Sequence, residues 1–228
     1  MNNEKEIFTK YFERIKLTWL ELGVPNKIIP FCTPLKKNPK FLIIGINHTD
    51  FSSNENEAKT IAENFSEGLP DVNTFIEHDH RFAKGLRSVI KRVHGRCNAF
   101  DDFPNEDWVG TNRIAIQTSS SDIFNHYGQL ESLDQYDKCK KEINKLLRSL
   151  ISFMQPKNII LAGQKSFEGL YFPKDSKLKD VKHKKILIDV KNGKTTNLIP
   201  VPHLSRGSFF KEAEERILNA IEDNCCYL

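Results

Sequence analysis

Short apolar segments that alternate with helical patterns place the strongest limit on how this chain can fold. The first segment, FLIIGI at residues 41–46, is bounded by Pro39 and by the polar residues Asn47–Asp50. Two further apolar segments follow at residues 108–118 (WVGTNRIAIQT) and 158–163 (NIILAG). Runs of this length are typical of strands buried on both faces of a parallel sheet. The three segments therefore predict neighbouring strands of one buried sheet.

The stretches between these segments have apolar residues at helical spacing. This spacing predicts an N-terminal helix over residues 4–22 and another helix over residues 80–94. A long helix is expected to open at Ser132, and a last helix is expected to be capped by Ser208. Residues 54–68 are interpreted as a polar helix or an insertion.

A β-hairpin is predicted near residues 185–202. The segments KKILIDV and TTNLIPVPH flank KNGK, and Asn192-Gly193 is the favoured two-residue hairpin turn. Strand–helix alternation in the rest of the chain favours an α/β fold. The expected architecture is a three-layer α/β/α sandwich with a central, mostly parallel four-stranded sheet, to which the hairpin is an extra element. We expect a single domain over residues 1–228, with its core at residues 40–224.

The composition excludes several classes of protein. The 228 residues are 39% hydrophobic and 28% charged, with no apolar run of membrane-spanning length and no apolar segment of a signal peptide at the start. The five cysteines are scattered and lack C-x-x-C spacing, which favours reduced thiols over disulfides, zinc or an iron–sulfur cluster. We expect a cytoplasmic monomer without a cofactor.

The positive charge of the chain is concentrated in one segment. The net charge is +4, yet residues 174–194 alone carry eight lysines against three aspartates. The rest of the chain is therefore close to neutral. A basic element on a near-neutral body suits a polyanionic partner, and a solvated hairpin is the alternative interpretation.

Polar residues follow each of the predicted parallel strands. In open α/β sheets, ligands bind beyond the carboxyl ends of the strands. The chain has no Gly-rich phosphate loop, no nucleophile elbow and no H-E-x-x-H zinc motif. The groups that remain can hydrogen-bond a nucleobase, orient a water molecule and stabilise a leaving anion. They are expected to converge from four segments: Asn47, His48, Asp50, Asn112, Gln164, His203, Ser205 and Arg206.

Five short motifs follow one another over roughly residues 40–212. They are GIN (45–47), HDHRFAKGL (78–86), Asn112 in TNRIAI, LAGQKSFEG (161–169) and PHLSRGSFF (202–210). In their order and spacing they resemble the uracil-DNA glycosylase superfamily, and the first motif is nearest to its mismatch-specific uracil/thymine branch. Two departures are that His48 stands where that branch has Pro, and that the second catalytic motif is shortened.

The resemblance implies a role for each residue around a base flipped out of DNA. Asn47 would position the hydrolytic water and Asp50 could act as the base, although both residue types are also common in turns. His203 would stabilise the departing pyrimidine, with an ordinary loop histidine as the alternative. Asn112 would read the edge of the base. The remaining substrate contacts would come from Gly45, Ile46, His48 and Phe75, the last by stacking unless it belongs to the core.

The resemblance also implies contacts with the DNA backbone. Phosphates would be held by Gln164, Lys165, Ser205 and Arg206, and Leu204 would fill the gap left by the flipped base or pack under its own loop. No metal is expected, because His78 and His80 lack a third ligand at metal spacing. The predicted function is a DNA-repair enzyme that excises uracil or another base from double- or single-stranded DNA. The alternatives are a catalytically inactive nucleic-acid-binding protein and an N-glycosidase acting on free nucleosides.

Overall fold

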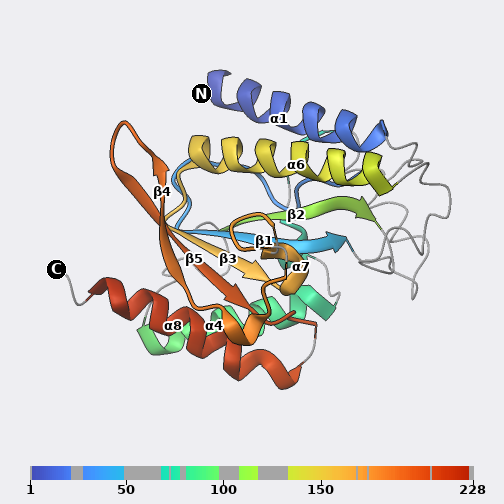
Figure 1. The fold of residues 1–228 in the computed structure, drawn as a ribbon. Coiled ribbons are helices and arrows are strands. Elements are labelled where there is room, and N and C mark those ends of the chain that lie inside the picture. Colours follow the sequence, from blue (N-terminus) through green and yellow to red (C-terminus); the bar gives the residue numbers. More distant parts are fainter. Residues whose placement is uncertain are drawn as a thin grey trace.

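A five-stranded, mostly parallel sheet forms the centre of the computed structural model (Figure 1). The structure describes residues 2–21, 28–48, 68–71, 73–77, 81–97, 108–117, 133–167, 169–173, 175–205 and 207–225. The strand order is β2-β1-β3-β5-β4, in which only β4 runs antiparallel to its neighbour. The strands are β1 Phe41–His48, β2 Trp108–Gln117, β3 Asn158–Ala162, β4 Lys184–Asp189 and β5 Lys194–Val201.

Helices cover both faces of the sheet. Figure 1 shows α1 and α6 above one face and α4 and α8 below the other. Two short helices, α3 and α7, and two 3-10 turns, η1 and η2, complete the described elements. Their bounds are α1 Asn2–Leu20, α3 Thr74–Glu77, α4 Arg81–Cys97, α6 Leu133–Met154, α7 Gln164–Phe167, η1 Leu178–Asp180, η2 Gly207–Phe209 and α8 Phe210–Cys225.

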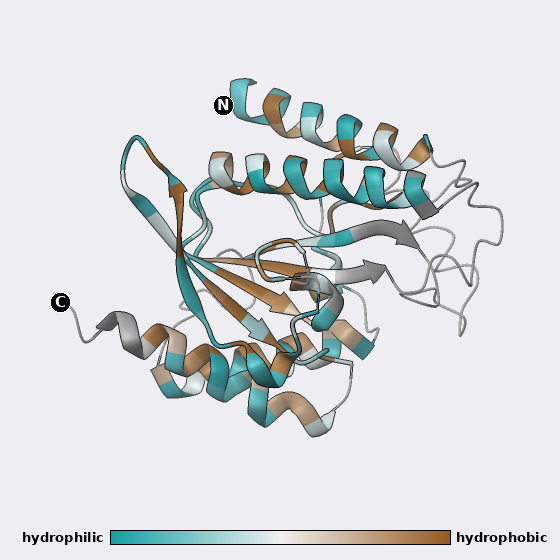
Figure 2. Cartoon of the chain, in the orientation of Figure 1, coloured by the Kyte–Doolittle hydropathy of each residue, from teal (hydrophilic) through white to brown (hydrophobic). Residues whose placement is uncertain are grey.

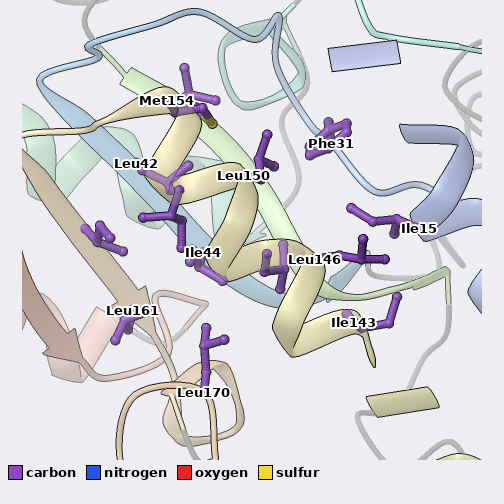
Figure 3. Packing of buried hydrophobic residues seen from close by; sticks show 14 of the residues in the cluster. Ile15, Phe31, Leu42, Ile44, Ile143, Leu146, Leu150, Met154, Leu161 and Leu170 are labelled. Carbon is purple, nitrogen blue, oxygen red and sulfur yellow. The ribbon is translucent and has the colours of Figure 1, made fainter. Parts of the chain in front are cut away.

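Alternate residues of the four parallel strands supply two separate apolar cores. Successive side chains of a strand point to opposite faces, so Leu42 and Ile44 of β1 join one cluster while Phe41 and Ile43 join the other. The first cluster packs under α1 and α6, and Figure 3 shows Leu146, Leu150 and Met154 of α6 around it. The brown apolar stripes of the helices in Figure 2 face the sheet, whereas teal polar residues face outward. This burial on both faces explains why the strands are continuous apolar runs.

The strand expectations are confirmed in type, whereas the expected strand count needs correction. Four parallel strands are present, but the fourth is β5, the second strand of the predicted hairpin, which pairs in parallel with β3 from Asn158↔Asn197 to Ala162↔Val201. Its partner β4 adds to the same sheet as an antiparallel edge strand. The hairpin is therefore the border of the central sheet, which has five strands, and not an element added to a four-stranded one.

The hairpin turn also differs from the predicted two-residue Asn-Gly turn. Asp189 pairs with Lys194, so four residues, Val190 to Gly193, form the loop. The Asp189 carboxylate accepts hydrogen bonds from the backbone N–H groups of Lys191 (3.0 Å) and Asn192 (3.2 Å) and from the Asn192 side chain (2.7 Å). These bonds lower the pKa of Asp189. Only Gly193 takes a positive φ here, of 63°, so the aspartate and not the Asn-Gly pair sets this turn.

The helix expectations are confirmed in type, with shifted ends. The first helix spans Asn2–Leu20 instead of 4–22, and α4 spans Arg81–Cys97 instead of 80–94. Ser208 lies within η2 and the last α-helix begins at Phe210, so Ser208 does not cap it. Ser132 and residues 54–67 lie outside the described residues. No described helix has the length and apolarity that crossing a membrane requires.

Candidate functional site

The carboxyl ends of the four parallel strands meet at one edge of the sheet. Gly45 of β1 is paired with Asn112 of β2, and the Gly163 N–H that follows β3 donates to the Val201 carbonyl at the end of β5 (2.9 Å). β1 continues beyond the expected end at Ile46 and reaches His48, with an irregular register between Asn47 and His48. The predicted convergence at this edge is therefore present in the backbone.

Asn112 is a buried amide fixed from three directions. Its side chain is on the α4 face of the sheet, and the residue is 6% exposed. Its backbone N–H donates to the Pro30 carbonyl (3.2 Å), and its side-chain Nδ2 donates to the Cys32 Sγ (3.1 Å). Its Oδ1 lies only 2.7 Å from the point that a Cβ on Gly45 would occupy. Glycine at position 45 therefore leaves the space that the Asn112 amide fills.

Cys32 anchors this amide and is not a nucleophile. The residue is fully buried, and burial raises the pKa of its thiol to about 12. A thiol with so high a pKa stays protonated at neutral pH, whereas nucleophilic cysteines need the thiolate. The Thr74 hydroxyl donates to the Cys32 carbonyl (2.7 Å), which ties the segment to α3. Cys32 therefore serves the site by orienting Asn112.

His203 lies two residues beyond β5 and is half-buried. Its Nδ1 is 2.8 Å from the Ser205 Oγ, and the Ser205 backbone N–H points to the same nitrogen at 3.4 Å. A backbone N–H can only donate, so this contact favours the tautomer of the neutral ring in which Nδ1 accepts and Nε2 carries the proton. The ring can thus present an N–H donor through Nε2.

Phe82 of α4 connects the two polar groups. Its ring lies 5.5 Å from the His203 ring between centroids, and its Cζ is 3.9 Å from the Cβ position of Gly45. In the sequence it is one of the apolar residues of the helix expected over residues 80–94, and no separate role was predicted for it. The signal that could have identified it is the HRF segment, in which Phe82 follows Arg81 at the start of α4. Gly45, Asn112, Phe82 and His203 thus form one continuous group at the carboxyl edge, which we call the edge site.

Leu204 and Phe75 are buried in the core beside the edge site. Leu204 is fully buried, and its carbonyl oxygen is only 1.7 Å from the Cβ position of Gly85, so the loop sits directly on α4. Phe75 is 2% exposed and stacks on Trp108 with ring centroids 5.7 Å apart. Both placements agree with the packing alternatives given above. Neither side chain is presented to a ligand in this structure.

The other predicted residues fall into three groups. Gln164 is exposed at the start of α7, and Ser205 is half-buried beside His203. Backbone alone is described for Ile46, Asn47, His48 and Lys165. Outside the described residues lie Asp50, His78, His80 and Arg206.

Within the described ranges, no three His, Cys, Asp or Glu side chains are grouped to hold a metal ion. A groove of about 730 Å³ lies on the other face of the sheet, where α1 and α6 line it with mostly charged side chains, and it is separate from the edge site.

In comparisons with known proteins, no protein-family model and no curated protein matches this chain.

Proposed function

We propose that the chain is a monofunctional DNA glycosylase that hydrolyses the N-glycosidic bond of a base flipped into the edge site and leaves an abasic site. The observation that carries the proposal is a buried amide bonded to Cys32 and an imidazole packed on the Phe82 ring, the first beside Gly45 and the second in the loop that follows β5, at the carboxyl ends of parallel strands. Base excision needs groups that read an edge and stabilise a leaving anion more than it needs a covalent nucleophile.

Asn112 would read the flipped base. A primary amide offers both a donor and an acceptor, which matches the paired groups along a pyrimidine edge. Because its backbone and its Nδ2 are both bonded, the side chain is preorganised and loses little freedom when the base arrives. The ring of Phe82 next to Gly45 would supply the apolar wall on which a base packs.

His203 would stabilise the departing base. As the bond to the sugar breaks, negative charge develops on the base, and a donor already aimed at an oxygen lowers the barrier. The Ser205 contacts favour the tautomer with the proton on Nε2, which is the donor form that this role needs.

Asn47 would position the hydrolytic water molecule, as the family resemblance implies, and Asp50 would act as its base. Asn47 lies in β1 two residues after Gly45, at the same edge as Asn112. The four parallel strands agree with the sheet that a uracil-DNA glycosylase-like sandwich would have, and this agreement supports the proposal. The proposal also assigns a cytoplasmic enzyme whose thiols stay reduced.

The test is strand cleavage by hot alkali after incubation with oligonucleotides that carry uracil paired with G, paired with A or single-stranded, and with a panel of modified bases. We expect alkali-labile sites with the wild type, and losses of about 100-fold or more in Asn112→Ala, His203→Ala and Asn47→Ala. Asn158→Ala is the matched control, because this other buried amide lies at the amino end of β3.

Two outcomes would contradict the proposal. DNA binding without abasic sites on any substrate would favour the inactive nucleic-acid-binding protein, an alternative that His48 in place of Pro suggests. Release of bases from free nucleosides, without cleavage of any oligonucleotide, would favour the small-molecule N-glycosidase.

A further inference from the structure

Residues 175–185 form a basic segment that leads into β4, which we call the basic strap. It carries five lysines and two aspartates, and Lys177, Lys179 and Lys182 are all exposed. Among the described residues, none of the ion pairs involves these three lysines. These three lysines therefore present positive charge without a described ion pair, and the strap as a whole has more lysines than aspartates.

The strap is held in a fixed position by α8. The Arg216 guanidinium donates to the carbonyls of Val181 (2.9 Å) and Leu178 (3.1 Å), and Val181 itself is buried. The Lys184 Nζ donates to the Tyr171 carbonyl (2.8 Å), which fixes the other end of the strap. The orange chain before β4 can be followed along α8 in Figure 1. Because the backbone that carries these lysines is held in place, it needs little rearrangement when the lysines bind a ligand.

Strand register brings the strap into the sheet from the edge at which the edge site lies. β4 is antiparallel to β5, and Lys184 is opposite Leu198. The chain before Lys184 therefore enters β4 from the carboxyl edge of the parallel strands. This is the edge at which β5 ends and His203 follows.

Protection of the sheet edge explains only part of this lysine content. Lysines in an edge strand discourage pairing with another chain, and this accounts for Lys184 and Lys185 in β4. Lys177, Lys179 and Lys182 precede the strand, with Lys179 inside η1 and the other two on either side of it, where there is no sheet edge to protect. Their presence calls for a different explanation.

We propose that the basic strap binds the phosphodiester backbone of DNA beside the nucleotide that enters the edge site. The inference rests on the proposed function for the identity of the polyanion. Lysine acts as a point charge toward phosphates, so the strap supplies affinity without sequence preference. Each neutralised phosphate releases counterions, which makes the contribution measurable as salt dependence.

The test compares two triple variants of the full chain that lose the same charge. One carries Lys177→Gln, Lys179→Gln and Lys182→Gln. The matched control carries Lys5→Gln, Lys157→Gln and Lys191→Gln, which are exposed lysines remote from the carboxyl edge. Binding of a short fluorescein-labelled DNA duplex is measured between about 50 and 200 mM salt.

We expect the strap variant to bind the duplex more weakly and with a shallower slope of log K against log salt. The slope should change by roughly 2 to 3, at about 0.9 per lost phosphate contact. The control should retain the wild-type slope.

Equal slopes in the two variants, or wild-type binding that does not respond to salt, would overturn the proposal. The proposal is also overturned if the strap variant loses binding to phosphatidylserine vesicles but keeps its binding to the duplex, because the strap would then bind a lipid surface and not DNA. Abasic-site formation is measured in parallel. A shallower slope without any abasic site would refute the proposed glycosylase activity but support DNA binding by the strap. Abasic sites with unchanged slopes would support the glycosylase activity and refute DNA binding by the strap.

Discussion

The two polar groups of the edge site are held in different ways. Asn112 is 6% exposed and is tied to Pro30 and Cys32, which lie about eighty positions earlier in the chain. His203 is half-buried and takes its hydrogen bonds from Ser205, two residues away. The Asn112 side of the site is thus part of the core, whereas the His203 side is a loop laid on α4.

Under the proposed function, this difference corresponds to two different tasks, reading the base and stabilising the leaving anion. A group that must discriminate between bases gains from rigid placement, since any freedom would allow the wrong partner to bind. A group that meets charge only as a bond breaks can be positioned by a local loop, provided the loop rests on a firm base. The absence of a side chain at Gly85 lets the loop of His203 pack directly on α4, and the absence of one at Gly45 leaves the space for Asn112.

The largest effect on stability is expected from disrupting the contact between the His203 loop and α4. In Gly85→Ala, the new methyl group would meet the Leu204 carbonyl at 1.7 Å, and this backbone atom cannot move without the whole loop. We expect a loss of about 3 kcal/mol in the free energy of unfolding, measured with urea. Gly95→Ala in the same helix meets nothing within 4 Å and should stabilise the protein by up to ~1 kcal/mol. Similar stabilities for the two variants would show that the loop is not held by this contact.

A second, smaller effect is expected on the Asn112 side. In Gly45→Ala, the methyl group would meet the Asn112 Oδ1, a side-chain atom that can be forced aside without moving backbone, so the free energy of unfolding should fall by only about 1 kcal/mol. Abasic-site formation should nevertheless fall by about 100-fold, because the reading group is displaced. Gly68→Ala, with open space at its Cβ position, is the control. Full activity in Gly45→Ala would show that Asn112 takes no part in the reaction.

The thiol beneath Asn112 should give the stability of the protein a pH dependence. Burial raises the pKa of Cys32 from 9.0 to about 12, so the folded state keeps its proton where the unfolded state loses it. The resulting stabilisation is complete below about pH 9 and is lost as pH rises toward 12, by up to about 1.4 kcal/mol per pH unit. Cys32→Ala should lack this slope in urea unfolding across the same range.

Tyr171, whose pKa burial also raises to about 12, titrates in both proteins, so its contribution cancels in this comparison. Parallel curves for wild type and Cys32→Ala would mean that the Cys32 thiol has no raised pKa.

The smallest effect is expected from Ser205→Ala, which removes one partner of the His203 Nδ1 and leaves the backbone N–H. The free energy of unfolding should change by less than about 0.5 kcal/mol, since the site is partly exposed. The rate of abasic-site formation should fall by less than about tenfold, and the neighbouring Ser208→Ala should have no effect. A loss as large as that of His203→Ala would assign Ser205 a direct part in the chemistry.

Sequence patterns were sufficient for the elements of the fold because each one has a local signal. The strand at 41–46 and the helix at 80–94 follow from apolar spacing within a few residues. Two details were missed because they depend on partners. The Asn192-Gly193 pair favours a two-residue turn in isolation, but the Asp189 carboxylate caps a four-residue loop instead. The strand at 194–201 pairs in parallel with β3, a distant partner that no local pattern of the hairpin identifies.

The edge site was predictable in its position and less so in its members. Parallel strands bring Gly45, Asn112 and His203 to one edge, and this followed from the alternation of strands and helices. The expected aromatic residue was Phe75, yet Phe82 contacts His203 because Phe75 stacks under β2 on Trp108. The contact between Asn112 and Cys32 joins residues 80 positions apart, and only the folded chain reveals it.

Burial of Cys32 has a further consequence for how motion at the edge site can be observed. A thiol reagent cannot reach a side chain with 0% exposure, so alkylation of Cys32 requires the surrounding segments to separate first. Its labelling rate in native buffer therefore measures how often this part of the protein opens, which can be far more frequent than global unfolding. Cys97, at the end of α4 and half-buried, lacks this complete shielding. The chain thus contains a natural kinetic probe directly beneath the Asn112 amide, and a ligand that closes the edge site would slow its labelling.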